Sequence, residues 1–369
     1  MSKSIYMYNP IVITKEKFFD LPGIRAFRQV FHLFNENVVL IDRTNTIQVP
    51  VKVKIHSPIP EFRKIDKTYE QICDERALNL LQRSEIKNLP IYTFYSGGID
   101  STLVLVSLLK NATLKQKERI HVLMSQDSIG ENPNFYRDYL RGKVHLEAAP
   151  IYPYLLSKRA IFVGGEYNDQ IFGSALFKEF MDFHGEAAIG TKYSRQKMSK
   201  MFENKWHEPK VISWYMDLFE ELFAVAPCPV STHADFLWWI NFTLKWQSVY
   251  FRMLTYASDF VSPNIDHDFI DNYFFHFYGT DDFQLWSMNN PDKKILKTWE
   301  SYKWEAKEVI YKFNKDDHYR KYKTKNGSLA WVIMHQIQKN FVDENMKMYP
   351  ALPKKEWYNR NNSFADAPF

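Results

Sequence analysis

The chain has 369 residues, of which 45% are hydrophobic and 25% charged, the composition of an ordinary globular protein with one large domain or two smaller ones. Its formal net charge of +5, from 48 basic and 43 acidic residues, is too small by itself to indicate a nucleic-acid-binding protein. Two distant cysteines give no support for a disulfide framework or a zinc site. Since no apolar run suits a signal peptide or a membrane span, we expect a cytoplasmic protein with no membrane partner.

The first expected elements are a hairpin and a helix. Two apolar, strand-like runs at 37–42 and 47–55 flank a polar turn at 43–46, which predicts a β-hairpin. Residues 68–87 place Ile and Leu at near-helical spacing after acidic residues, which predicts a helix.

Between residues 91 and 164, short apolar runs alternate with helical segments. This alternation is typical of parallel βαβ units. We therefore expect an α/β fold in which a parallel twisted sheet carries helices on both faces. The expected strands are 91–95, 120–124, 144–146 and 160–163, and the expected helices are 102–110 and 133–141.

Beyond about residue 185 the pattern becomes helical, with apolar residues at helical intervals in 211–224, 234–256 and 299–312. We accordingly expect three regions. They are a small N-terminal β-hairpin region (1–65), an α/β domain (66–185) and a mainly helical region with a polar tail (186–369).

The most informative segment is the run Ser-Gly-Gly-Ile-Asp-Ser at 96–101, between an expected strand and an expected helix. Gly97 and Gly98 have no side chain to keep a phosphate from the backbone, and the amides and dipole of a helix N-terminus attract anions. Asp100 suits a phosphate site only if Mg²⁺ lies between the two, so the pattern indicates ATP and Mg²⁺. The alternative is a glycine-rich turn that caps a helix. In the phosphate-binding interpretation, the side chains that can donate hydroxyl hydrogen bonds are Ser96, Ser101 and Thr102.

This run resembles the signature of the PP-loop ATP pyrophosphatases, which have the adenine nucleotide α-hydrolase-like fold. Within them the chain is most similar to the synthetase domain of glutamine-dependent asparagine synthetases and their relatives, the β-lactam synthetases and lasso-peptide cyclases. Residues 162–174 read FVGGEYNDQIFGS, where these proteins have G-[ED]-G-A-D-E-L-F-G-G. Glu166 and Asp169 match this pattern, whereas Tyr167 replaces a glycine and Gln170 an acid. An acidic pair at a helix N-terminus is the alternative interpretation.

The resemblance implies roles for several residues. Asp100 and Asp169 would hold Mg²⁺ against the triphosphate. Met124 and Ser125 would lie beside the adenine, and Gly165 would belong to the same nucleotide site.

Two further segments are similar to the family more loosely. Residues 259–266 read DFVSPNID where relatives have E-x-R-x-P-F-L-D, so Asp259 is kept but Val261 replaces the arginine. This replacement argues against ordinary asparagine synthesis. Lys325, in Lys-Asn-Gly, resembles the family lysine that stabilises charge on pyrophosphate, although Lys321 and Lys323 are close in sequence. For residues 259–266 the alternative is the exit of a helix into a loop, and for Lys325 it is a solvated basic loop.

The expected function is an ATP-dependent C–N ligase that adenylates a carboxyl substrate, releases pyrophosphate and transfers the acyl group to an amine with release of AMP. Glu166 or Asp259 would orient the amine or accept its proton. Ser2 stands where the family's glutaminase domain has a catalytic cysteine, so the amine would come from ammonia, a separate glutaminase or the substrate itself. The expected catalytic residues are Asp100, Glu166, Asp169, Asp259 and Lys325.

Two other functions stay open. A PP-loop enzyme that modifies a nucleobase or nucleic acid is favoured only by the basic stretch 312–325. An inactive nucleotide-binding scaffold is permitted by Gln170 and Val261.

Overall fold

The structure is a computed structural model whose backbone contacts divide the chain into two compact units. Unit 1 comprises Met1–Lys67, Tyr167–Thr255 and Thr280–Trp304, and unit 2 comprises Thr68–Glu166, Tyr256–Gly279 and Glu305–Phe369. The three regions expected from the sequence stay a prediction. The residues that the structure describes are 4–5, 41–47, 52–53, 55–124, 126–148, 159–203, 208–247, 249, 271–324, 340–342 and 348–350.

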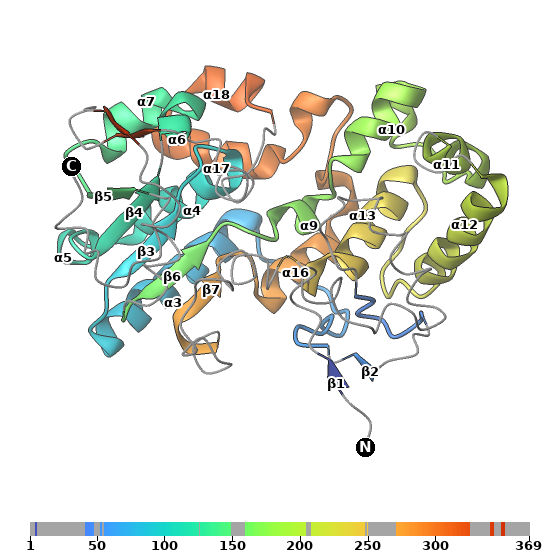
Figure 1. The fold of residues 1–369 in the computed structure, drawn as a ribbon, viewed down its shortest axis with the longest axis horizontal. Helices are drawn as coiled ribbons and strands as arrows, with labels where there is room; N and C mark the ends of the chain where they lie inside the picture. Colours follow the sequence, from blue (N-terminus) through green and yellow to red (C-terminus); the bar gives the residue numbers. More distant parts are fainter. Residues whose placement is uncertain are drawn as a thin grey trace. The chain divides into compact units, whose positions relative to one another are not determined.

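Unit 2 contains a five-stranded sheet in the order β5-β4-β3-β6-β7, and every neighbouring pair is parallel (Figure 1). All residues of β3 and β6 are buried, as expected for strands that are covered on both faces. The α/β fold with a parallel sheet is therefore confirmed, and β7 is an additional strand that the apolar runs did not predict. The strands are β3 (Ile91–Phe94), β4 (Ile120–Met124), β5 (His145–Ala148), β6 (Ile161–Gly164) and β7 (Phe274–His276).

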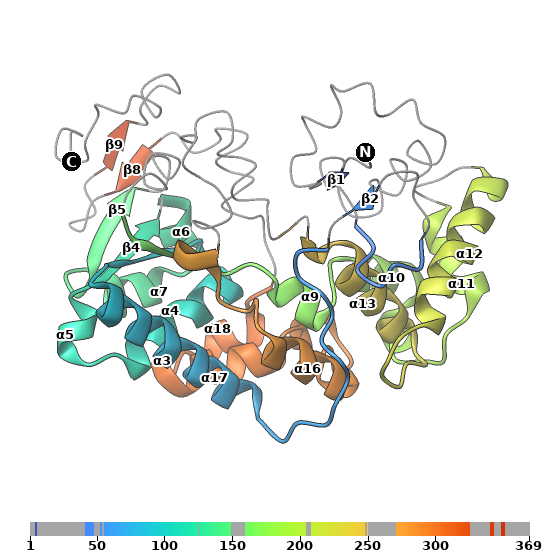
Figure 2. The ribbon, with the colours of Figure 1, turned by 90° about the horizontal axis from the view of Figure 1, so that it is seen from below.

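Three helices of unit 2 are joined at one glutamate. α3 (Tyr69–Lys87) matches the predicted helix, and α4 (Ile99–Asn111) begins three residues earlier than expected. Glu70 of α3 pairs with Lys110 of α4 at 2.7 Å and with Lys312 of α17 (Trp304–Asn314) at 2.6 Å. Figure 2 shows α3 beside α17. The remaining elements are α5 (Leu114–Lys117), α6 (Gln126–Glu131), α7 (Pro133–Phe135), the π-helical turn η3 (Tyr136–Leu140), α18 (Asp317–Tyr322), β8 (Asn340–Val342) and β9 (Met348–Pro350).

Unit 1 is mainly helical in its described part. Every residue of α13 (His233–Leu244) is buried, which makes it the central helix of the unit's core. α12 (Pro209–Ala224) confirms the helix predicted at 211–224. In the helix predicted at 299–312, residues 299–301 form a short 3-10 turn and residues 304–312 belong to α17. The other elements are β1 (Ser4–Ile5), β2 (Lys52–Val53), α9 (Asn168–Phe172), α10 (Leu176–His184), η5 (Glu186–Ala188), α11 (Arg195–Phe202), α16 (Asp281–Asn289), η6 (Pro291–Lys293) and η7 (Trp299–Ser301).

Most of the hairpin predicted at 37–55 lies outside the described residues. Residues 41–47 form a turn in which Asn45 has a φ of 59° and the Asp42 carboxylate accepts hydrogen bonds from the amides of Thr44 and Ile47, both at 2.8 Å. The strand β2 pairs in parallel with β1, which is not a hairpin pairing. Within the described part of the chain, no helix is long and apolar enough to cross a membrane.

Candidate nucleotide site

The loop that joins β3 to α4 is held by its own serines. Ser101 Oγ accepts a hydrogen bond from the Ser96 amide at 3.1 Å and lies 3.0 Å from Ser96 Oγ. Ser96 Oγ in turn accepts from the Gly98 amide at 3.3 Å. These contacts close the loop into a tight turn, so the two serines shape the loop in addition to offering hydroxyl groups.

The two glycines of this loop differ in what a side chain would meet. Gly97 has a φ of +74°, and a Cβ there would lie 2.4 Å from Ser128 O and 2.6 Å from Glu131 Cβ. Gly98 has a φ of −72°, and a Cβ there would approach only Ser96 Oγ, at 3.3 Å. Gly97 is therefore required by the fold, whereas Gly98 leaves room above the backbone.

The helix that follows the loop starts without a side-chain cap. α4 has Gly98 at its N-cap, whereas Thr68, Thr113 and Thr232 each begin a helix with a complete capping box. A glycine cap leaves amides of the first turn available for another acceptor. Together with the helix dipole, these amides favour an anion at the start of α4.

Two tyrosines from distant parts of unit 2 fix the backbone of the loop. The Tyr319 hydroxyl lies 3.3 Å from Gly97 O and 3.3 Å from Thr102 Oγ1. The Tyr278 hydroxyl donates to Asp100 O at 2.8 Å. Burial raises the pKa of both tyrosines well above the ordinary value, so they remain neutral donors.

The end of β6 packs closely on the loop. A Cβ on Gly165 would lie 3.2 Å from the Ser101 amide nitrogen, so only glycine allows this approach without a shift of the backbone. The structure thus brings Gly165, a residue expected at the nucleotide site, against the start of α4. Glu166 follows directly. Met124 is buried at the end of β4, the neighbouring parallel strand, and Ser125 lies outside the described residues.

Asp169 belongs to unit 1, where it meets a buried cation. Its Oδ1 lies 2.7 Å from Lys303 Nζ and accepts a hydrogen bond from the Tyr302 hydroxyl at 3.2 Å. The Lys303 side chain is only 2% exposed, and its backbone has a φ of 59°. The Asp169 carbonyl accepts from Asn241 Nδ2 of α13 at 2.9 Å. The aspartate is therefore held at both its side chain and its backbone. Its role as a Mg²⁺ ligand stays a prediction.

Tyr167, where the family pattern has a glycine, has a φ of +82°. This backbone conformation suits glycine and costs about 1–3 kcal/mol in other residues. The Tyr167 ring stacks on Trp246 at 4.1 Å with an interplanar angle of 10°. The stacking offsets part of the strain and explains how a tyrosine can occupy this position.

The basic stretch near the C-terminus places one lysine beside the loop. Lys323, with 11% of its side chain exposed, pairs with Glu131 and also donates to Glu131 O at 3.2 Å. Glu131 packs against Gly97, since its Cβ lies 2.6 Å from the position that a Cβ on Gly97 would take. Lys325, the lysine expected to act on pyrophosphate, lies outside the described residues together with Asp259 and Val261.

Sequence reasoning missed the residues that reach the loop 96–101 or Asp169 from far along the chain. Tyr278, Tyr302, Lys303 and Tyr319 follow no motif or spacing that singles them out. Only the fold brings Tyr319 to Gly97, 222 positions away. A comparison of the chain with models of protein families gives no match, and neither does a comparison with curated proteins.

Proposed function

We propose that the chain binds ATP with Mg²⁺ at the loop 96–102 and cleaves it between the α- and β-phosphates to activate a carboxyl substrate for attack by an amine. The observation that carries this proposal is the SGGIDS loop at the carboxyl end of β3, which leads into the uncapped start of α4. Ligands of open parallel sheets bind at this edge. The PP-loop identity of the fold is part of the same proposal.

The residues of the loop fit a triphosphate. Gly98 leaves the backbone open, and the first-turn amides of α4 offer donors to phosphate oxygens. Asp100, in the first turn of α4, would hold Mg²⁺, which would supply charge neutralisation for the leaving pyrophosphate. Lys323 pairs with Glu131, which packs against Gly97, and we assign to Lys323 or to Lys325 a supporting positive charge.

The proposed reaction has two steps. A carboxylate oxygen of the substrate attacks the α-phosphorus of ATP and expels pyrophosphate, which yields an acyl-adenylate. The amine then attacks the acyl carbon, AMP leaves, and the amine proton passes to a carboxylate, for which Glu166 and Asp259 are the candidates. The roles of Met124, Ser125, Gly165 and Asp169 in this reaction remain proposals of the same kind.

The alternative of a nucleic-acid substrate loses part of its support. In the described part of the stretch 312–325, four basic side chains already form ion pairs with carboxylates. Paired cations release fewer counterions on binding a phosphate backbone. These residues are Lys312, Arg320, Lys321 and Lys323.

Titration of Mg²⁺–ATP against the wild-type chain tests the binding step. We expect saturable binding that Gly98→Ala weakens at least about tenfold, or ~1.4 kcal/mol, because a methyl group would occupy the phosphate position while the fold persists. Asp138→Ala, which removes an exposed carboxylate of the same unit, is the matched control and is expected to bind as the wild type does. Equal ATP affinity of Gly98→Ala and wild type would contradict the proposed phosphate position.

A further inference from the structure

A buried arginine of unit 1 has most of its guanidinium hydrogen bonds unmade. Arg43 is 4% exposed, and only its Nη2 has a described acceptor, Gln284 Oε1 at 2.7 Å. Among the described residues, its Nε and Nη1 have no hydrogen-bond partner. These two atoms carry most of the N–H donors of the group. An arginine is rarely buried in this way, because a buried charged donor without an acceptor is strongly destabilising.

Two neighbouring aromatic rings, 5.3 Å apart, lie against this guanidinium. Its Cζ lies 4.9 Å from the centre of the Phe242 ring and 4.6 Å from that of the Trp246 ring. The ring of Tyr167, whose backbone has a φ of +82°, stacks on Trp246. Rings attract the cation but accept no directed hydrogen bond from its edges. The planar group is therefore fixed in place while its N–H edges keep their donor capacity.

The surrounding charges favour a guest with a single negative charge. The turn that carries Arg43 is tied to the C-terminal end of α13, where Arg43 N donates to Thr243 O at 3.3 Å. The Asp42 carboxylate is already occupied by its own turn. Burial lowers the pKa of Arg43 to about 9, while Tyr167, Asp281 and Asp42 act in the opposite direction, so the group is charged at neutral pH. With acidic groups close by, a carboxylate fits better than a doubly charged phosphate.

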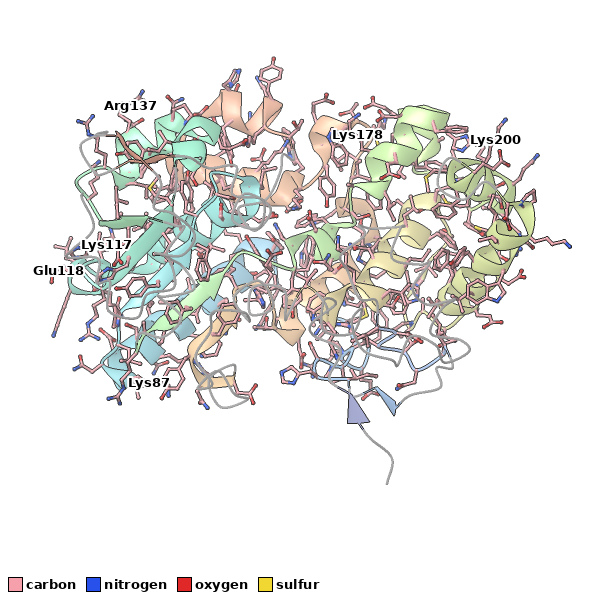
Figure 3. All side chains as sticks on the ribbon, viewed as in Figure 1. Lys87, Lys117, Glu118, Arg137, Lys178 and Lys200 are labelled. Carbon is pink, nitrogen blue, oxygen red and sulfur yellow. The ribbon has the colours of Figure 1, made fainter. Side chains whose placement is uncertain are left out.

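From this geometry we infer that Arg43, which lies against the adjacent rings of Phe242 and Trp246, is the binding residue for a carboxylate group of a small-molecule ligand in unit 1. A guanidinium donates to both oxygens of a carboxylate in one plane, which a lysine does not reproduce. By contrast, the cations Lys178 and Lys200 extend from the surface of α10 and α11 (Figure 3). That this ligand is the acid activated by ATP rests on the proposed function, whereas the binding itself does not.

Binding is measured without nucleotide, by calorimetry and by the fluorescence of the buried tryptophans. The probes are acetate, L-lactate, L-aspartate and L-glutamate, which each carry a net charge of −1 at neutral pH, with inorganic phosphate alongside them. We expect saturable binding of at least one of the four acids to the wild-type chain, weakened at least about tenfold in Arg43→Lys and lost in Arg43→Gln. The surface variant Lys200→Gln is expected to bind as the wild type does.

Three outcomes would overturn the inference. They are a wild-type chain that binds none of the four acids, a wild-type chain that binds phosphate in preference to all of them, and an Arg43→Lys chain that binds with unchanged affinity. Arg43→Lys keeps the buried charge, so it carries the test if circular dichroism shows that Arg43→Gln is unfolded. Because ATP is absent, a failure here leaves the nucleotide proposal standing, and a failure to bind ATP leaves this inference standing.

Discussion

Replacement of either glycine of the loop by alanine is expected to change the free energy of unfolding by very different amounts. In Gly97→Ala, the new methyl group has to occupy a backbone with a φ of +74° and would lie 2.4 Å from the Ser128 carbonyl oxygen. The left-handed backbone costs an alanine about 1–2 kcal/mol, and relief of the overlap costs about 1–3 kcal/mol more. We therefore expect the free energy of unfolding to fall by about 2–5 kcal/mol, measured by urea denaturation followed by circular dichroism.

Gly98→Ala is the matched control for this experiment. Its φ of −72° is open to any residue, and the nearest atom to a new Cβ is Ser96 Oγ at 3.3 Å, the end of a side chain that can rotate. An alanine cap is slightly worse than a glycine cap, so we expect a change of less than about 1 kcal/mol. If Gly97→Ala were as stable as Gly98→Ala, the packing of the loop against Ser128 and Glu131 would be refuted.

Two other predictions concern buried lysines. Asp169→Asn is expected to lower the free energy of unfolding by about 2–3 kcal/mol, because the 2% exposed Lys303 loses the carboxylate that pairs with it. The double variant with Lys303→Met should recover most of this loss in urea denaturation. Equal instability of the single and the double variant would argue against a stabilising ion pair. Lys294 donates to Ser287 O at 2.8 Å, and burial lowers its pKa to about 8 from an ordinary 10.5. The folded state thus binds fewer protons than the unfolded state between these values, and stability should rise by up to about 3 kcal/mol as the pH increases through this window. Lys294→Met should remove this rise, and an unchanged pH profile would contradict the assignment.

Local sequence patterns predicted the strands of the sheet, because the formation of these strands depends on residues that are close together in the sequence. The runs 91–95, 120–124 and 160–163 are apolar and bounded by turn residues, and β3, β4 and β6 occupy these positions. The predicted start of α4 is three residues too late, since the aspartate and serine at 100 and 101 are typical of helix caps and turns. The helix begins there because Gly98 suits the N-cap and the first turn is held by the serines of the loop.

The site could be predicted only where its residues are consecutive. The loop and the neighbouring Gly165 come from short motifs. The hydroxyl of Tyr319 and the guanidinium of Arg43 reach their partners across 222 and 241 positions, and no spacing in the chain indicates such pairs. The turn at Arg43 was predicted as part of a hairpin, and its function as a buried cation follows only from the packing of α13 and α16 around it.

The central claim is that this chain cleaves ATP at the α-phosphate, and product analysis tests it most directly. Wild type and Asp100→Ala are incubated with ATP, Mg²⁺ and a pool of cell metabolites, and the nucleotides are separated by mass. The account predicts AMP and pyrophosphate with the wild type, loss of both with Asp100→Ala, and consumption of a carboxylic acid from the pool. Formation of ADP and phosphate, or unchanged AMP formation by Asp100→Ala, would contradict it.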